Sequence, residues 1–106
     1  MCRKVHGAVF GTYAVVARGA FRLTAGSQEV RRFESSPGVF RFFCGSCGCQ
    51  IYCEEERRPS ITFYAPASLD AGCSPGHSRA RERHIYVGSK ACWYDIGDGL
   101  PQSEGA

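Results

Sequence analysis

The sequence feature that most constrains this chain is a cysteine cluster in residues 43–53, which holds four of the seven cysteines. Its centre is Cys44-Gly45-Ser46-Cys47, and a glycine follows the second cysteine. Two cysteines separated by two small residues can turn both sulfurs toward one tetrahedral metal ion, because glycine tolerates the positive φ angles of a tight knuckle. A structural zinc takes four ligands, at roughly 2.3 Å for each thiolate. The pair therefore predicts half of a zinc site, and its other ligands must be sought elsewhere.

Length and charge bound the possible classes of protein. A chain of 106 residues predicts a single domain over residues 1–106, of a size at which a bound metal helps stability. The net charge is +3, and the basic residues are spread along the chain. We therefore expect no nucleic-acid partner. Solvated strand faces account for most of the arginines, while the binding of an acidic small molecule stays open.

Cysteine usage and hydropathy indicate the compartment. No apolar run approaches the roughly 20 residues of a membrane span, so we expect no membrane partner. The first residues lead into no signal-peptide core, which predicts a cytoplasmic protein. In a reducing compartment, an odd number of cysteines favours thiols and metal binding over a disulfide framework.

The pattern of short apolar stretches between Gly, Pro and Ser predicts a mainly β domain with long loops and little helix. A long loop is expected over residues 66–82, with one helical turn at 78–82. The expected strands are residues 8–17, 21–23, 29–34, 39–43, 49–53, 60–65, 84–87 and 92–96.

The strands on either side of the cysteine pair predict a hairpin with the pair at its tip. In the second strand, the period of two places Cys49, Ile51 and Cys53 on one face. Cys49 and Cys53 are therefore expected to be core thiols, since buried cysteine behaves as a small hydrophobe. Trp93 and Tyr94 are also expected in the core.

Several segments together resemble one family, the glutathione-dependent formaldehyde-activating enzymes and their centromere protein V type relatives. The matching segments follow the family order over nearly the whole chain. They are residues 3–7, 10–14, 21–23 with Gly26, 35–38, 43–48, 84–85, and Trp93 with 98–101.

The resemblance implies a zinc-binding folded-sheet domain, the β-tent, with two zinc sites. The structural site would combine an early Cys-x-Cys with Cys44 and Cys47. The site near the substrate would use a Cys-His-Cys-x-x-Cys run whose last cysteine matches Cys2, which makes Cys2 a metal ligand and the catalytic candidate. The earlier cysteines of both sites lie before residue 1 in the family pattern, so the chain resembles a family member that lacks its N-terminal cysteine-rich segment.

Zinc is thus the implied cofactor, with incomplete ligand sets. Structural zinc is worth on the order of 10 kcal/mol to a small fold, so we expect lower stability unless substitute ligands are found. A second copy of the chain is one source of ligands. Candidates within the chain are His6, Cys49, Cys53, Cys73, His77, His84 and Cys92.

Alternative roles stay open at each position. A redox role for Cys44 and Cys47 is disfavoured, because no helix follows the first cysteine to lower its pKa. Cys2 is either a metal ligand or a thiol that binds no metal. His6 is an available nitrogen ligand if its segment is helical and otherwise a surface histidine. His84 is expected to be structural, or to support a ligand, before it is a ligand itself.

The implied activity is that of a carbon-sulfur lyase, which forms or cleaves S-hydroxymethylglutathione from glutathione and formaldehyde. Arg3, Lys4 or Arg18 could position the carboxylates of glutathione. Because most catalytic zinc ligands are missing, enzymatic activity stays open. The alternative is an inactive zinc-binding or interaction domain that forms a homodimer, for example by strand exchange at exposed sheet edges.

Overall fold

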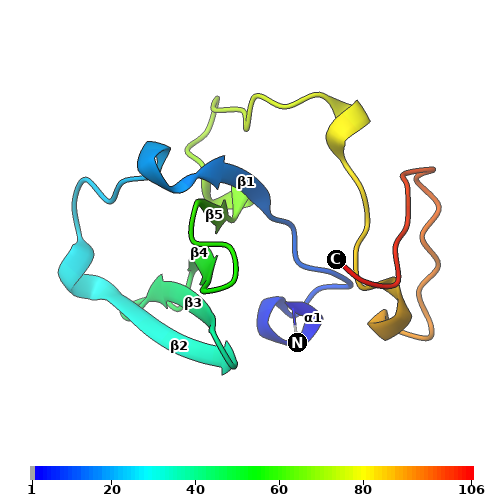
Figure 1. The fold of residues 1–106 in the computed structure, drawn as a ribbon, viewed down its shortest axis with the longest axis horizontal. Coiled ribbons are helices and arrows are strands. Elements are labelled where there is room, and N and C mark those ends of the chain that lie inside the picture. Colours follow the sequence, from blue (N-terminus) through cyan, green and yellow to red (C-terminus); the bar gives the residue numbers. More distant parts are fainter. Residues whose placement is uncertain (1) are drawn as a thin grey trace. The chain divides into compact units, whose positions relative to one another are not determined.

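A computed structural model describes residues 2–106 and divides them into two units. Residues 12–75 form the first unit and contain a five-stranded antiparallel sheet (Figure 1). Residues 2–11 and 76–106 form the second, which consists mainly of loops. The predicted mainly β class with little helix is confirmed, whereas a single domain over residues 1–106 stays a prediction.

The sheet has the strand order β1-β5-β4-β3-β2. Strands β2 to β5 are neighbours in chain order and form successive hairpins, while β1 pairs with β5 through Ala14 opposite Tyr64. Valine, isoleucine and aromatic residues favour these strands because their side chains pack well on a pleated surface. The bounds are β1 Ala14–Ala17, β2 Val30–Ser36, β3 Val39–Cys44, β4 Gln50–Glu55 and β5 Ile61–Tyr64.

Two turns fix the register of this meander. Gly38 has φ 70° in the turn between β2 and β3, and its N–H donates to Glu34 Oε1 at 2.9 Å. After β4, the carboxylate of Glu55 accepts hydrogen bonds from Arg57 at 2.9 Å and Arg58 at 2.8 Å. Burial raises the pKa of Glu55, but the two arginines outweigh it, so the pKa lies below its ordinary value.

Aromatic residues pack on one face of the sheet. Phe42 and Tyr52 are opposite each other on β3 and β4, and their rings stack with centroids 4.2 Å apart. Phe21 covers Tyr52 with a centroid separation of 4.8 Å. Burial raises the pKa of Tyr52, and the nearby Glu54 carboxylate adds to this while Arg18 opposes it. The stack therefore supplies much of the apolar packing of this face.

The fully enclosed part of the sheet is small. Thr62 on β5 is completely buried, and Cys53 on β4 is 7% exposed. The edge strands remain open, because Val15 on β1 is 60% exposed and Phe33 on β2 is 55% exposed. The predicted burial of Cys53 is confirmed.

In the second unit, backbone hydrogen bonds join residues 84–87 to the C-terminal segment. The His84 N–H donates to the Pro101 carbonyl at 2.8 Å, and the Ser103 N–H donates to the His84 carbonyl at 3.0 Å. This pairing makes one isolated parallel bridge, between His84 and Gln102. The helix α1 spans Cys2–His6.

Short 3-10 turns connect the elements in both units. The expected helical turn at 78–82 is present as one of them. Their bounds are η1 Arg18–Ala20, η2 Ser27–Glu29, η3 Pro66–Ser68, η4 Arg79–Arg81 and η5 Val87–Ser89.

Four of the expected strands were wrong in whole or in part. Within residues 8–17 only β1 is extended, because Gly7 at φ 60° ends α1 and the chain reaches a strand partner only at Ala14. Residues 21–23, 84–87 and 92–96 form no strand, since apolar composition makes a strand only where a neighbouring chain accepts its hydrogen bonds. Trp93 is 76% exposed, so its expected place in the core was also wrong, while Tyr94 is half-buried.

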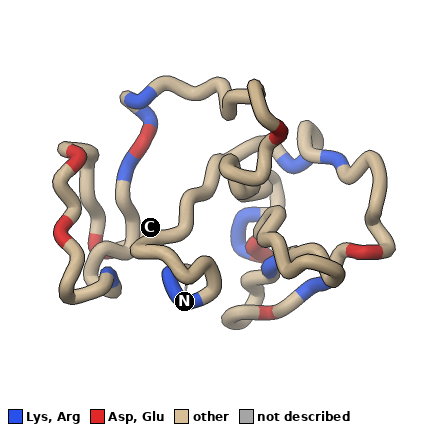
Figure 2. Tube along the Cα trace, turned by 180° about the vertical axis from the view of Figure 1, so that it is seen from behind, with Lys and Arg blue, Asp and Glu red and all other residues tan. Residues whose placement is uncertain are grey.

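Lys and Arg are spread along the trace, with Asp and Glu among them (Figure 2). The prediction of a chain without a basic run therefore holds for the described residues, although the absence of a nucleic-acid partner stays a prediction. None of the helices in residues 2–106 is long and apolar enough to cross a membrane.

Candidate functional site

The Cys44–Cys47 pair lies at the tip of the β3–β4 hairpin, as the sequence predicts. β3 ends at Cys44, whose N–H donates to the Cys49 carbonyl at 2.9 Å. The chain then turns, and the Gly48 N–H donates back to the Cys44 carbonyl at 2.8 Å. Gly48 has φ 76°, a conformation that glycine adopts without the strain of a Cβ atom. We call residues 44–48 the knuckle.

Glu29, just before β2, anchors the knuckle from the side. Its carbonyl accepts the Gly45 N–H at 2.7 Å, and its carboxylate accepts the Ser46 hydroxyl at 2.7 Å. A Cβ atom on Gly45 would lie 3.0 Å from Arg31 Cγ and 3.1 Å from the Glu29 carbonyl oxygen. Glycine at position 45 therefore allows the close approach that these hydrogen bonds need.

The anchored turn directs hydrogen-bond donors at the Cys44 sulfur. The backbone N–H groups of Cys47 and Ser46 donate to it, as does the Cys47 thiol, and these contacts lower the pKa of Cys44 below its ordinary value of 9.0. Burial and the Glu29 carboxylate act in the opposite direction but are weaker. Hydrogen bonds to a thiolate favour the charged form, which is the form that binds metal.

These residues fit a zinc ion as two of its four ligands. Both sulfurs come from one tight turn, and the backbone already favours the Cys44 thiolate that zinc requires. Within residues 2–106, no three His, Cys, Asp or Glu side chains are grouped so that they could hold a metal ion. The knuckle thus offers thiolates that suit zinc, but the described residues group fewer ligands than the four that a structural zinc takes.

The remaining cysteines do not join the knuckle. Cys49 is exposed, so its expected place in the core was wrong. The reason is a register shift between Phe42 and Phe43, which interrupts the alternation of β4 and leaves Cys49 before the strand begins. Cys73 and Cys92 are exposed as well, and no disulfide links cysteines among residues 2–106.

Cys2 lies in the second unit, on helix α1. His6 lies one helical turn after Cys2. The segment is therefore helical, which was the condition for His6 to be an available nitrogen ligand. A Cβ atom on Gly11 would lie 2.7 Å from the His6 ring and 3.2 Å from Cys2 Cβ. Both side chains therefore lie beside the Gly11 backbone on one face of α1.

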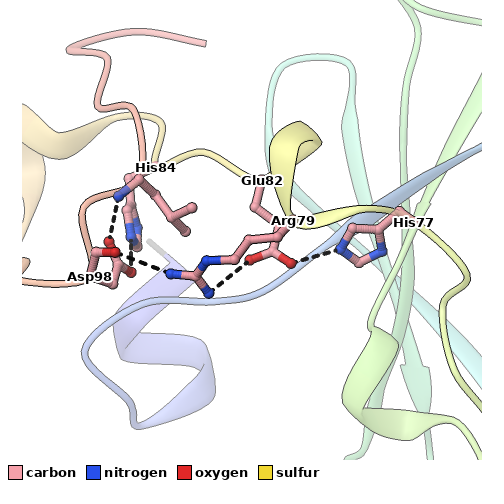
Figure 3. Close-up of polar contacts among 6 residues, drawn as sticks. His77, Arg79, Glu82, His84 and Asp98 are labelled. Atoms are coloured by element: carbon pink, nitrogen blue, oxygen red, sulfur yellow. Dashed lines mark hydrogen bonds and ion pairs between the residues drawn. The ribbon is translucent and has the colours of Figure 1, made fainter.

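His84 forms a polar network with Asp98 (Figure 3). His84 Nε2 lies 2.7 Å from Asp98 Oδ2, and the hydrogen bond with His84 is the main reason that the pKa of Asp98 is lowered. The Phe10 ring covers the histidine edge-on, with centroids 5.3 Å apart. Arg79 donates to the Asp98 carbonyl at 3.1 Å. His84 thus joins separate segments of the second unit, as expected of a structural residue.

His77 and Glu82 form the other end of the same network. His77 Nε2 lies 3.2 Å from Glu82 Oε1, and Arg79 lies 4.0 Å from the same carboxylate (Figure 3). The described contact of His77 is with a carboxylate and not with a cysteine, so the structure gives no support to His77 as a substitute ligand.

Sequence reasoning missed Glu29 and Asp98 as supporting residues. Asp98 carried a usable signal, since its Oδ1 accepts the Leu100 N–H at 3.0 Å, a local turn that Asp followed by Gly favours. Glu29 carried none, because its contact with Ser46 spans 17 residues and depends on the register of β2 against β3.

The fold and the knuckle define a small, mainly β protein with a Cys-x-x-Cys turn at the tip of a hairpin. A family model described as glutathione-dependent formaldehyde-activating enzyme matches residues 1–89, and the chain belongs to this family. The family name refers to the activation of formaldehyde with glutathione. No solved structure matches the chain.

Proposed function

We propose that this chain is a zinc-binding domain that acts on the carbon-sulfur bond of glutathione-formaldehyde adducts. The observation that carries the proposal is the knuckle, in which two backbone N–H groups and a thiol donate to the Cys44 sulfur in a member of this family. Cys44 and Cys47 are the proposed structural ligands, and Cys2 with His6 the proposed donors at the substrate site.

The proposed reaction conserves oxidation state. The glutathione sulfur attacks the carbonyl carbon of formaldehyde, a sulfur-carbon bond forms, and the thiol proton moves to the oxygen. Cleavage is the reverse. Zinc, when bound, supplies the ability to hold a thiolate at neutral pH or to polarise a carbonyl oxygen.

The cations beside Cys2 suit the carboxylates of glutathione. Arg3 and Lys4 are exposed on α1, next to Cys2 in sequence. Arg18 instead forms a 2.8 Å ion pair with Glu54 in the first unit, so it is the weaker of the three candidates. We therefore propose Arg3 and Lys4 as the residues that bind the glutathione carboxylates.

The test is the exchange of formaldehyde with its glutathione adduct, followed by NMR in the presence of the zinc-loaded chain. We expect exchange faster than the spontaneous rate and a loss of most of that increment in Cys2→Ser. Cys73→Ser is the matched control, because Cys73 is exposed and belongs to the first unit, whereas Cys2 belongs to the second. Exchange at the spontaneous rate with the wild-type chain would refute the catalytic proposal.

A non-catalytic interaction domain is the second candidate. It is supported by the exposure of Val15 and Phe33 on the two edge strands of the sheet. Open edges with apolar side chains favour pairing with another strand, and the occupant we propose is a second copy of this chain.

A further inference from the structure

The imidazole of His84 is separate from the contacts that tie its segment into the second unit. Those contacts are made by the His84 backbone, whose N–H donates to the Pro101 carbonyl at 2.8 Å and whose carbonyl accepts the Ser103 N–H at 3.0 Å. The imidazole instead meets the Asp98 carboxylate, with Nε2 2.7 Å from Oδ2 (Figure 3). An imidazole that a carboxylate orients is the arrangement in which histidine serves as a general base. The side chain therefore has a chemical role open to it that the backbone contacts do not explain.

Asp98 determines which nitrogen of the His84 ring carries the proton. An ionised carboxylate only accepts hydrogen bonds, so the neutral ring has its proton on Nε2 and leaves Nδ1 as the acceptor. Asp98 is itself held in place, because its Oδ1 accepts the Leu100 N–H at 3.0 Å and its carbonyl accepts Arg79 at 3.1 Å. Within residues 2–106, the hydrogen bonds described for the ring are made by Nε2 alone. Nδ1 is thus the nitrogen that can take a proton from a substrate.

Phe10 and Gly11 connect His84 to the proposed donors at the substrate site. The Phe10 ring meets the His84 ring edge-on, with centroids 5.3 Å apart. A Cβ atom on Gly11 would lie 2.7 Å from the His6 ring and 3.2 Å from Cys2 Cβ. Consecutive Cα atoms are about 3.8 Å apart. One short stretch of backbone in the second unit therefore borders the His84 ring with one residue and the Cys2–His6 pair with the next.

The histidine and its carboxylate are partly shielded but not sealed. The side chain of His84 is 13% exposed and that of Asp98 is 39% exposed. The charged groups that face the ring are the Asp98 carboxylate and, behind it, the Arg79 guanidinium. A carbonyl compound as small as formaldehyde can approach such a pair, while the Phe10 ring covers one side of the imidazole.

We propose that His84 moves the proton of the reaction, with Asp98 as the residue that positions it. The inference rests on the proposed function and names the group that transfers its proton. Nδ1 accepts the thiol proton as the glutathione sulfur attacks the carbonyl carbon of formaldehyde, and the same proton then passes to the oxygen. A sulfur-carbon bond forms as the carbon-oxygen double bond becomes single, so no oxidant or reductant is needed. Cleavage of the adduct is the reverse.

The experiment measures formaldehyde exchange with its glutathione adduct by NMR in the zinc-loaded chain and its variants. His84→Ala keeps the backbone bonds, and we expect its kcat to fall by about 100-fold with KM little changed. His77→Ala is the matched control, because His77 is the other histidine of the second unit that pairs with a carboxylate, at 3.2 Å from Glu82. It should exchange at the wild-type rate, and circular dichroism checks the fold of both variants.

Two further readouts separate proton transfer from a structural role. Imidazole added to the buffer should restore part of the lost kcat in His84→Ala, because a free base can replace the missing one, and it should not restore Cys2→Ser. Nitrogen-15 NMR of the wild-type chain should show the neutral His84 ring protonated on Nε2. Asp98→Asn should lose that preference and should lower kcat as well. The ring measurement on the wild type needs no variant, so it remains decisive if His84→Ala does not fold.

The contrary outcomes are distinct. A wild-type rate in His84→Ala, beside a loss of exchange in Cys2→Ser, would overturn the role of His84 and leave the proposed function intact. A slow, folded His84→Ala that imidazole does not accelerate would overturn it too, because the ring would then act only in packing. A wild-type His84 ring protonated on Nδ1 would also overturn it. Exchange at the spontaneous rate with the wild-type chain would refute the proposed function and this inference together.

Discussion

At the scale of single residues, Cys44 is distinguished by the hydrogen bonds that its sulfur accepts. The N–H groups of Cys47 and Ser46 and the Cys47 thiol lower its pKa, and Glu29 acts against them. Glu29→Gln keeps a hydrogen-bond acceptor for Ser46 and removes the charge. The pKa of Cys44 should therefore fall further, and its alkylation at neutral pH should become faster.

Peptide-resolved mass spectrometry of the metal-free chain, alkylated over a series of pH values, measures this pKa. The wild-type midpoint at Cys44 should lie below 9.0, the ordinary value, and the variant midpoint lower still. A midpoint that rises in Glu29→Gln would contradict the assigned electrostatic role of Glu29.

Gly45 provides a second test at the same scale. In Gly45→Ala, the new Cβ would meet Arg31 and the Glu29 carbonyl at 3.0–3.1 Å, which displaces the knuckle from its anchor. We expect zinc affinity to fall by about 10-fold, as is usual when the support of a metal ligand is disturbed. Competition with a chromophoric chelator measures the affinity.

The matched control for this substitution is Gly19→Ala. A Cβ at Gly19 meets nothing within 4 Å, and zinc affinity should be unchanged. Equal affinities in the two alanine variants would mean that the close approach of Gly45 does not support the site.

At the scale of elements, β5 contains a buried polar group that sequence could not reveal. Thr62 is fully buried, and its hydroxyl has no hydrogen-bond partner among the described residues. Thr62→Val removes the desolvated hydroxyl at nearly constant shape, so we expect a gain of about 1 kcal/mol in the free energy of unfolding. Urea denaturation measures it.

Thr62→Ser is the complementary variant at this position. It keeps the hydroxyl and deletes the methyl group, and it should lose about 1 kcal/mol through the small cavity left behind. Stabilities in the reverse order would indicate that the hydroxyl of Thr62 finds a hydrogen-bond partner in solution.

The strands show which parts of the fold local sequence patterns predict and which parts they do not. The hairpins of β2, β3, β4 and β5 were predictable, because Pro37-Gly38, the knuckle and the charged turn after β4 separate clear β-forming stretches. The short β1 was overestimated, since its neighbours are as apolar as the strand itself. Sequence alone placed Cys44 and Cys47 at the tip of a hairpin, but it did not predict the Glu29 anchor or the exposure of Cys49, both of which depend on strand register.

At the scale of the whole molecule, acid stability depends on two carboxylates with lowered pKa values. Asp98 is held by His84, and Glu55 by Arg57 and Arg58. In the folded chain the pKa of Asp98 lies below its ordinary 3.8, and the pKa of Glu55 lies below its ordinary 4.5. Each carboxylate therefore stabilises the fold at pH values above its ordinary pKa, and this stabilisation is lost as the pH falls through the lowered pKa. Stability should therefore fall as pH drops below about 4.5.

Asp98→Asn and Glu55→Gln test this pH dependence. Each variant should be less stable than the wild type at pH 7, and the difference should shrink in acid as the wild-type carboxylate becomes protonated. Thermal unfolding from pH 7 to pH 3 measures the difference. A gap between wild type and variant that stays constant over this range would exclude a stabilising contribution from the carboxylate charge.

The central claim is that Cys44 and Cys47 bind zinc. Elemental analysis of the purified chain, beside Cys44→Ser prepared in the same way, tests it most directly. The wild-type chain should contain zinc, and the variant should contain none and be less stable. If both contain no zinc and unfold at the same temperature, the claim is wrong.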